Sequence, residues 1–211
     1  SKACAELVVS SYRQSFFHPA NISNHGVSLS SVRAGNVIGG GDWAVDRIIP
    51  DCIRALSDNK VINVRNPHAI RPWQHVLEPL SGYLWLAAQQ WQNPGISEGG
   101  WNFGPTGNGN VNVKNIVESV VHRWGEGTWY SPEMKYDQMH EARFLKLDVT
   151  KVNSLLAWSP VWSVQQTIEY TVDWYRQRHD AESEFDASGL CMAQIQAYIG
   201  DAVKQGAPWA Y

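Results

Sequence analysis

Apolar residues recur at helical spacing in several segments of the chain, and these stripes predict most of its secondary structure. The clearest stripe begins at about Val76 and ends where Asn93-Pro94-Gly95 breaks the helical pattern. Asn112 and the Ser163-x-x-Gln166 capping box stand directly before two further stripes and predict where those helices begin. The other predicted helices cover residues 1–16, 48–56, 151–156 and 190–203, with Asp46 as the expected cap of the second.

Short apolar segments between these helices predict strands. The candidates lie at residues 27–33, 61–64 and 101–103, with brief extended pieces around Trp129 and at 144–148. Residues 65–73 are expected to form a loop. Helices that alternate with short apolar strands are typical of an α/β fold. The strands are too few to close a doubly wound sheet.

The composition narrows the classes of partner. With 44% hydrophobic and 18% charged residues among 211, the chain is typical of a soluble globular protein. Its net charge of −3 argues against a nucleic-acid groove or an anionic membrane as a partner. The longest apolar run, residues 83–88, is far shorter than the ~20 residues that span a bilayer. The 3 cysteines are widely spaced, which argues against a disulfide framework or a metal site and favours a cytoplasmic setting.

The candidate chemistry lies in cationic and amide side chains near the ends of the predicted strands. No dinucleotide-type glycine fingerprint, phosphate loop, nucleophile elbow or zinc-protease motif occurs in the sequence. Arginine offers paired donors that suit a diphosphate, particularly beside a glycine-rich turn such as Gly39-Gly40-Gly41. The alternative interpretation is that these arginines form weak surface ion pairs. The residues concerned are Arg33, Asn36, Arg47, Asn63, Arg71, Asn102 and Arg143.

Several motifs in combination resemble one family of nucleotide-sugar enzymes. The first helix resembles the end of the Tyr-x-x-x-Lys helix of extended short-chain dehydrogenases/reductases, with Lys2 in the place of the lysine. Further segments resemble the CDP-glucose 4,6-dehydratases in particular, and together they extend over almost the whole chain. These segments are residues 33–43, 47–51, 65–76, 101–105, 141–148 and 191–198.

This resemblance implies a fold and a reaction. The expected fold is α/β, with an incomplete Rossmann-type sheet and a C-terminal, mostly helical lobe that binds the substrate. Residues 1–40 and 74–105 would belong to the dinucleotide-binding lobe, and residues 41–73 and 106–211 to the nucleotide-sugar lobe. Enzymes of this family use bound NAD to oxidise CDP-glucose at C4, eliminate water across C5 and C6, and return the hydride to C6. The product is CDP-4-keto-6-deoxyglucose.

The resemblance also implies roles for single residues. Lys2 would be catalytic, because its positive charge would lower the pKa of the family's tyrosine, and it would also bond the nicotinamide ribose of NAD. Ala34 and Val37 would lie against the nicotinamide. The expected substrate-binding residues are Asn36, Arg47, Ile48, Asn63, Arg71, Asn102, Glu141 and Arg143.

The start of the sequence departs from the family pattern. The chain begins within a predicted helix, and neither the family's tyrosine nor its glycine fingerprint is present. We therefore expect the C-terminal portion of such an enzyme, inactive alone, that forms a homodimer or associates with a missing N-terminal half. The helices at 7–17 and 76–91 are expected to keep one face uncovered. Other interpretations stay open: a different nucleotide-sugar dehydratase or epimerase, a non-catalytic interaction module, or a truncated product without a role.

Overall fold

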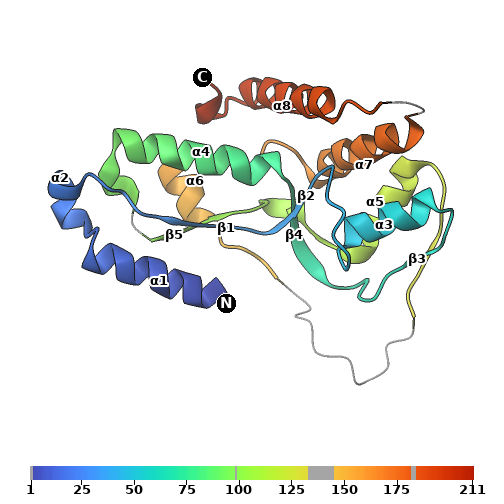
Figure 1. The fold of residues 1–211 in the computed structure, drawn as a ribbon, viewed down its shortest axis with the longest axis horizontal. Coiled ribbons are helices and arrows are strands. Elements are labelled where there is room, and N and C mark those ends of the chain that lie inside the picture. The colour runs from blue at the N-terminus through green and yellow to red at the C-terminus, as the bar shows by residue number, and fades with distance from the viewer. Residues whose placement is uncertain (1, 98, 133–144, 182–183) are drawn as a thin grey trace.

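The computed structural model describes residues 2–97, 99–132, 145–181 and 184–211, in which helices alternate with short strands (Figure 1). The α-helices are α1 (Lys2–Ser15), α2 (Ile22–His25), α3 (Ile48–Ser57), α4 (Leu77–Gln92), α5 (Val113–Trp124), α6 (Thr150–Leu156), α7 (Val164–Asp180) and α8 (Ala187–Lys204). The strands are β1 (Ser31–Ala34), β2 (Asn36–Ile38), β3 (Ile62–Asn63), β4 (Ile70–His75), β5 (Gly100–Phe103), β6 (Asn110–Asn112) and β7 (Trp129–Tyr130). Short 3-10 helices lie at Pro19–Asn21, Pro94–Ser97, Gly107–Gly109 and Pro208–Ala210.

Parallel pairing dominates the strands and confirms the expected α/β class. β1 pairs with β5, β2 with β4, and β3 with β7, all in parallel, while β6 joins β4 in the antiparallel sense. Gly35 alone separates β1 from β2, so one run of chain enters two sheets in succession. A Cβ at Gly35 would lie 2.5 Å from the carbonyl oxygen of Pro72, so the close approach to β4 requires glycine at this position.

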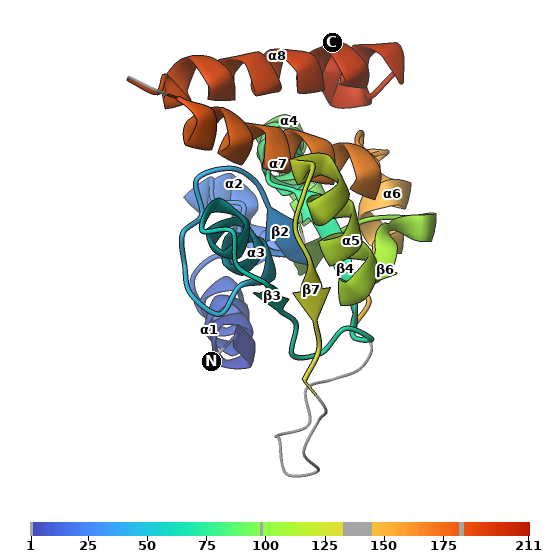
Figure 2. The same cartoon turned by 90° about the vertical axis from the view of Figure 1, so that its right-hand side faces the viewer.

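The main core lies where α3, α5 and α7 pack around β2 and β4 (Figure 2). α5 and α7 begin at the predicted caps: Asn112 accepts a hydrogen bond from the backbone N–H of Asn115, and Ser163 with Gln166 forms a complete capping box. The apolar stripe predicted for α3 is buried. The buried residues of this core include Ile49, Ile53, Ile116, Val117, Val120, Ile168 and Val172.

A second core covers one face of the β1–β5 pair. α4 and α6 pack on this face, and Trp101, Phe103 and Trp158 are completely buried there. A Cβ at Gly82 of α4 would lie 2.2 Å from the ring of Phe103, so this helix approaches the strand as closely as glycine permits. α8 extends along α4 and α7, as Figure 1 shows, and its Tyr198 packs within a third core.

The structure corrects two predictions, one about the segment before α4 and one about the cap of α3. Residues 70–73 belong to β4, not to a loop, and every residue from Arg71 to His75 is buried. A strand that is buried on both faces shows no alternation of polar and apolar residues. In β4 a proline and three polar residues also interrupt the apolar run that would mark such a strand. Asp46 does not cap α3: it has a φ of 62° and pairs with Arg65, while Arg47 precedes the helix without a side-chain cap.

The buried face of α4 also differs from the prediction. The expected apolar stripe includes Leu80, Leu84 and Trp91, but these side chains are 45%, 74% and 89% exposed. The buried residues of α4 are Glu78, Pro79, Gly82 and Leu86. The helix therefore turns a carboxylate and a glycine toward the protein. Its large apolar side chains lie on an uncovered face, as the sequence predicts.

The sequence did not predict α2, β2 or β6, and further differences concern boundaries. β1 begins at Ser31 and not at residue 27, and β3 holds only the centre of the predicted strand at 61–64. Residues 145–148 form no strand, and Phe144 lies outside the described residues. The division into two lobes stays a prediction. In the described part of the chain, none of the helices combines the length and the apolar character that crossing a membrane requires.

Candidate functional site

Three of the predicted ligand-binding residues lie on the paired strands β2 and β4. Asn36 lies on β2 opposite Trp73 of β4, and Val37, the next residue, is 37% exposed. Arg71 lies two residues before Trp73 and is buried, and its Nη1 donates to the carbonyl oxygen of Ile70 at 2.9 Å. Asn36 and Arg71 therefore lie on neighbouring strands of one sheet.

Arg47 and Ile48 lie where the glycine-rich turn after β2 leads into α3. Nη1 of Arg47 donates to Oδ2 of Asp42 at 2.9 Å, and the arginine side chain stays 65% exposed. The hydrogen bond from the backbone N–H of Ala44, with a further one from Arg47, holds the pKa of Asp42 below its ordinary value. Ile48 packs against the main core. The ion pair uses only Nη1, and the side chain is exposed, so Arg47 can also contact an anionic ligand.

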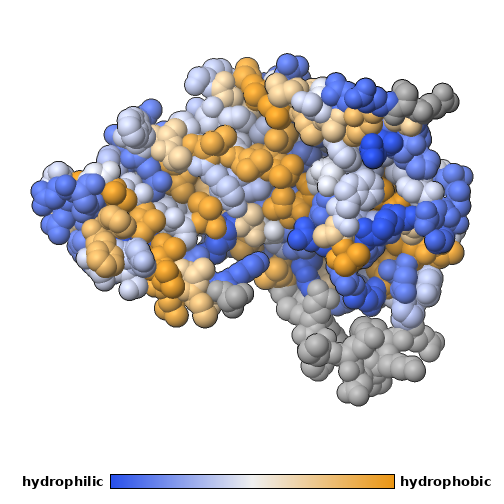
Figure 3. All heavy atoms as spheres, in the orientation of Figure 1, coloured by the Kyte–Doolittle hydropathy of each residue, from blue (hydrophilic) through white to orange (hydrophobic). Residues whose placement is uncertain are grey.

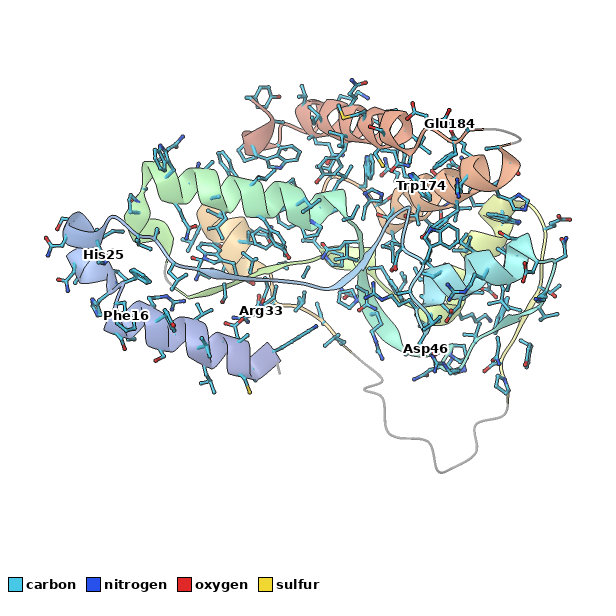
Figure 4. The ribbon with its side chains drawn as sticks, in the orientation of Figure 1. Phe16, His25, Arg33, Asp46, Trp174 and Glu184 are labelled. Carbon is cyan, nitrogen blue, oxygen red and sulfur yellow. The ribbon has the colours of Figure 1, made fainter. Side chains whose placement is uncertain are left out.

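Asn102 and Lys2 belong to a different part of the molecule, the face of the β1–β5 pair toward α1. Oδ1 of Asn102 accepts from Arg33 at 3.3 Å, and its Nδ2 donates to the carbonyl oxygen of Asp148 at 2.9 Å. Arg33 also pairs with Glu6 of α1 at 2.8 Å, and Figure 4 shows it between that helix and β1. Lys2 is exposed in the first turn of α1. The Asn102 amide is thus engaged within the protein.

Some of the predicted site residues lie away from β2 and β4. Asn63 is exposed on β3, opposite Tyr130 in a separate sheet. Ala34 ends β1, two residues before Asn36. Glu141 and Arg143 lie outside the described residues. Among the residues that the structure does describe, no group of 3 or more His, Cys, Asp or Glu side chains could hold a metal ion.

Two buried titratable residues were not predicted from the sequence. One is the last residue of β4, and the other lies in the first turn of α4. His75 is 1% exposed, its Nδ1 accepts from the backbone N–H of Leu77 at 3.3 Å, and burial lowers its pKa to about 4. Glu78 is fully buried and accepts from the backbone N–H of Trp162 at 2.7 Å and from the hydroxyl of Tyr198 at 2.7 Å. Burial raises the pKa of Glu78, although these hydrogen bonds oppose the shift. Both residues read as ordinary polar positions in the sequence, because nothing local shows that they are buried.

Comparison with solved structures shows the fold of the chain. UDP-glucose 4-epimerase from Thermotoga maritima, crystallised with UDP-glucose, matches 84% of this chain and 52% of its own, with a TM-score of 0.64 and 18% identity. dTDP-glucose 4,6-dehydratase from Streptomyces venezuelae, with NAD and TYD bound, matches 83% of this chain and 49% of its own, with a TM-score of 0.63 and 18% identity. The chain therefore has the Rossmann-type fold of the extended short-chain dehydrogenases/reductases, which confirms the expected fold class.

Comparison with curated proteins gives a match with higher sequence identity. CDP-glucose 4,6-dehydratase of Salmonella typhimurium is 49% identical to this chain over 177 residues, which is 83% of the chain. This match confirms the resemblance that the motifs indicate. It covers 49% of that enzyme, so the chain spans about half the length of this relative. No protein-family model matches the chain.

Proposed function

We propose that the chain serves in a nucleotide-sugar dehydratase of the CDP-glucose 4,6-dehydratase type and supplies mainly its substrate-binding part. The observation that carries this proposal is the 49% identity over 177 residues to the Salmonella typhimurium enzyme. The site geometry supports it, because Asn36, Arg71 and the exposed Arg47 are all placed around one sheet and the turn that leaves it. The reaction would convert CDP-glucose to CDP-4-keto-6-deoxyglucose.

The two arginines have distinct parts in this proposal. Arg47 is exposed and can turn its guanidinium to a diphosphate, for which arginine offers bidentate hydrogen bonds. Arg71 is buried at the sheet and would fix the position of the ligand's charged group. The other proposed substrate residues are Asn36, Ile48, Asn63, Asn102, Glu141 and Arg143. Residues 41–73 and 106–211 would form the lobe that contains most of them.

The residues of this chain that we propose to bind NAD suit only the nicotinamide end of the cofactor. Lys2 and Val37 are exposed and Ala34 is half-buried, so these positions can take a ligand. Bound NAD would supply the hydride acceptor for oxidation of the sugar. Lys2 would hold the ribose and place a positive charge beside the reacting groups. The sequence contains no glycine fingerprint for the adenine end, so we expect little NAD binding by the 211-residue chain.

Self-association is part of the same proposal. α1 has no buried residue, and Leu7, Val8, Tyr12 and Phe16 are 71%, 55%, 53% and 65% exposed. Figure 3 shows apolar surface on the same part of the molecule. An exposed apolar helix face of this kind is typical of an interface. Sedimentation of the chain at several concentrations would show a dimer or larger assembly if the proposal holds, and a monomer throughout would contradict it.

Calorimetric titration of the 211-residue chain with CDP, dTDP and NAD tests the function. We expect CDP to bind more tightly than dTDP. Arg47→Ala should weaken CDP binding by about tenfold, as loss of a charge-assisted contact to phosphate implies. Arg123→Ala is the matched control, because Arg123 is also an exposed arginine in an ion pair with a carboxylate, Asp173 of α7. It should leave CDP binding unchanged.

The alternatives give different results in the same titration. Tighter binding of dTDP than of CDP would favour another nucleotide-sugar dehydratase or epimerase. If a chain shown to be folded by circular dichroism binds no nucleotide, the proposed function is wrong and a non-catalytic interaction module replaces it. NAD binding as tight as that of CDP would contradict the proposed division of labour.

A further inference from the structure

Two side chains of α7 close over the glycine-rich turn that follows β2. Trp174 is 7% exposed and Tyr175 is 1% exposed. The hydroxyl of Tyr175 donates to the carbonyl oxygen of Asp42 at 2.6 Å, and the carbonyl oxygen of Gly39 lies 3.4 Å from the same hydroxyl. The hydroxyl therefore reaches both ends of the turn from a helix that is 133 positions away from Asp42 in the sequence.

The ring of Trp174 presses on the middle of the same turn. A Cβ at Gly40 would lie 2.1 Å from Cγ of Trp174, a distance that no side chain could adopt. Gly41 follows with a φ of 85°, in the left-handed region that favours glycine. Figure 4 shows Trp174 between α7 and this turn. The conformation of the turn thus depends on contacts with α7 as well as on its own glycines.

Asp42 connects this turn to the proposed ligand-binding arginine. Its carboxylate accepts from the backbone N–H of Ala44 at 3.0 Å and from Arg47 at 2.9 Å. Arg54 of α3 donates to the carbonyl oxygen of Trp43 at 3.0 Å and fixes the segment between these residues. Asp42 is therefore bonded by the Tyr175 hydroxyl at its backbone carbonyl and by the guanidinium of Arg47 at its carboxylate.

We propose that Tyr175 is a positioning residue: its hydroxyl holds the glycine-rich turn in the conformation that presents Arg47 to the diphosphate of the nucleotide. This inference rests on the proposed function, because it assigns Tyr175 a part in that same site. The ring alone would fill the space beside Trp174, but only the hydroxyl bonds the backbone of the turn. Removing it leaves a carbonyl oxygen without its buried partner, which frees the turn to move.

The hydroxyl also stays a donor over the whole physiological range. Burial, together with the nearby charge of Asp42, raises the pKa of Tyr175 to about 12. The ring of Trp43 packs nearly perpendicular to that of Tyr175, with 5.2 Å between centroids. The link to Asp42 therefore does not depend on pH near neutrality.

The test is Tyr175→Phe in the 211-residue chain, with Tyr170→Phe as the matched control. Tyr170 lies on the same helix, but its ring stacks on Trp162 in the third core, with centroids 4.0 Å apart. We expect Tyr175→Phe to weaken CDP binding about fivefold to tenfold, in the range expected for loss of one buried hydrogen bond. Tyr170→Phe should change CDP binding less than about twofold.

A double-mutant cycle separates positioning from a general structural effect. If Tyr175 acts through Arg47, Tyr175→Phe should have almost no further effect on CDP affinity once Arg47→Ala is in place. Hydrogen exchange gives a second readout: the backbone amides of residues 39–44 should exchange faster in Tyr175→Phe, while those of α5 keep their protection.

The outcomes distinguish this inference from the proposed function. If the unsubstituted chain binds CDP and Arg47→Ala weakens binding, but Tyr175→Phe has no effect, the function stands and the positioning role is wrong. Equal losses with and without Arg47 would also overturn it, because they would show that Tyr175 acts on the whole fold. If the unsubstituted chain binds no CDP, the proposed function fails, and the inference about Tyr175 fails with it.

Discussion

The β1–β5 strand pair has two faces that are built in opposite ways. On one face, α4 and α6 cover Trp101 and Phe103, which are completely buried against Trp158. On the other face, Ser31 and Arg33 bond the carboxylate of Glu6 of α1 at 2.7 Å and 2.8 Å. The first face is an apolar core, and the second is a polar contact between a strand and a helix.

This difference shows which contacts hold each helix in place. Buried apolar area contributes most of the stability of a fold, whereas exposed ion pairs contribute about 0–1 kcal/mol each. α1 has none of its 14 residues buried, so its attachment rests on the polar contacts to β1 and on the bond from Arg13 to the carbonyl oxygen of Leu29. We therefore expect substitutions on the α4 side to change the free energy of unfolding far more than substitutions on the α1 side.

The largest effect is expected for Phe103→Ala, which removes a ring that is 0% exposed and packs edge-on against Trp158 and Tyr83. Its loss should lower the free energy of unfolding by about 3–5 kcal/mol, because the cavity cannot be refilled. The matched control on the other side is Phe16→Ala, whose ring is 65% exposed. It should cost less than about 0.5 kcal/mol in urea unfolding. Similar losses for the two variants would show that the α1 side is packed as firmly as the α4 side.

The next effect concerns pH and the buried His75. Its pKa is lowered to about 4 in the folded chain from an ordinary value of 6.5. The unfolded state therefore binds the proton first, and stability that is complete above pH 6.5 falls as the pH decreases toward 4. A shift of this size corresponds to about 3 kcal/mol.

Urea unfolding between these pH values measures the loss, with His75→Gln as the variant that cannot titrate. We expect the variant to lose most of the pH dependence over this interval. His68 is an exposed histidine before β4, and His68→Gln is the control that should keep the dependence. An unchanged slope in His75→Gln would show that another group is responsible.

A smaller effect is expected for Glu78→Ala at the start of α4. The substitution removes the acceptor of the backbone N–H groups of Val161 and Trp162 and of the Tyr198 hydroxyl. Leaving such buried donors unpaired should cost about 1–3 kcal/mol. Because Tyr198 lies on α8, amide exchange in α8 should also become faster. Glu118→Ala on α5, where the carboxylate is exposed beside Lys114, should cost less than about 0.5 kcal/mol. Equal behaviour of the two glutamate variants would mean that Glu78 does not anchor α8.

Local signals predicted the helices better than the strands or the site. Asn112, Ser163 and Gln166 mark the starts of α5 and α7 because a helix cap is a contact between residues close in the sequence. β4 could not be predicted from the sequence, because a strand that is buried on both faces lacks alternation of polar and apolar residues. The inward orientation of Glu78 on α4 could not be predicted either, because its hydrogen-bond partners lie about 80 positions away.

The same distinction applies to the candidate site. The motifs named Asn36, Arg47 and Arg71 as ligand-binding residues, which stays a prediction, and they gave no sign of Tyr175. Its contact with Asp42 joins residues that only the tertiary fold brings together, and a tyrosine in a helical apolar stripe looks like any core residue. A motif can therefore suggest which positions bind a ligand, whereas a contact such as that of Tyr175 with Asp42 requires the structure.

The smallest expected effect tests the polar side of the comparison directly. Glu6→Gln removes the charge that pairs with Arg33, in a contact where the two side chains are 36% and 45% exposed. The hydrogen bond from Arg33, with another from Ser31, holds the pKa of Glu6 below its ordinary value, so the pair stabilises the fold above that value and is lost as pH falls. Because the pair is exposed, its contribution should be below about 1 kcal/mol and should be screened by salt.

Global unfolding is too coarse for this change, so the readout is hydrogen exchange in α1. We expect its amides to lose protection in Glu6→Gln and, to a similar degree, in the unsubstituted chain at about 1 M NaCl, where the Debye length is ~3 Å. Glu126→Gln, an exposed glutamate after α5, is the control that should change nothing. If α1 kept its protection under both treatments, apolar contacts would have to hold it. The two faces of the β1–β5 pair would then differ in composition without differing in the kind of force that covers them.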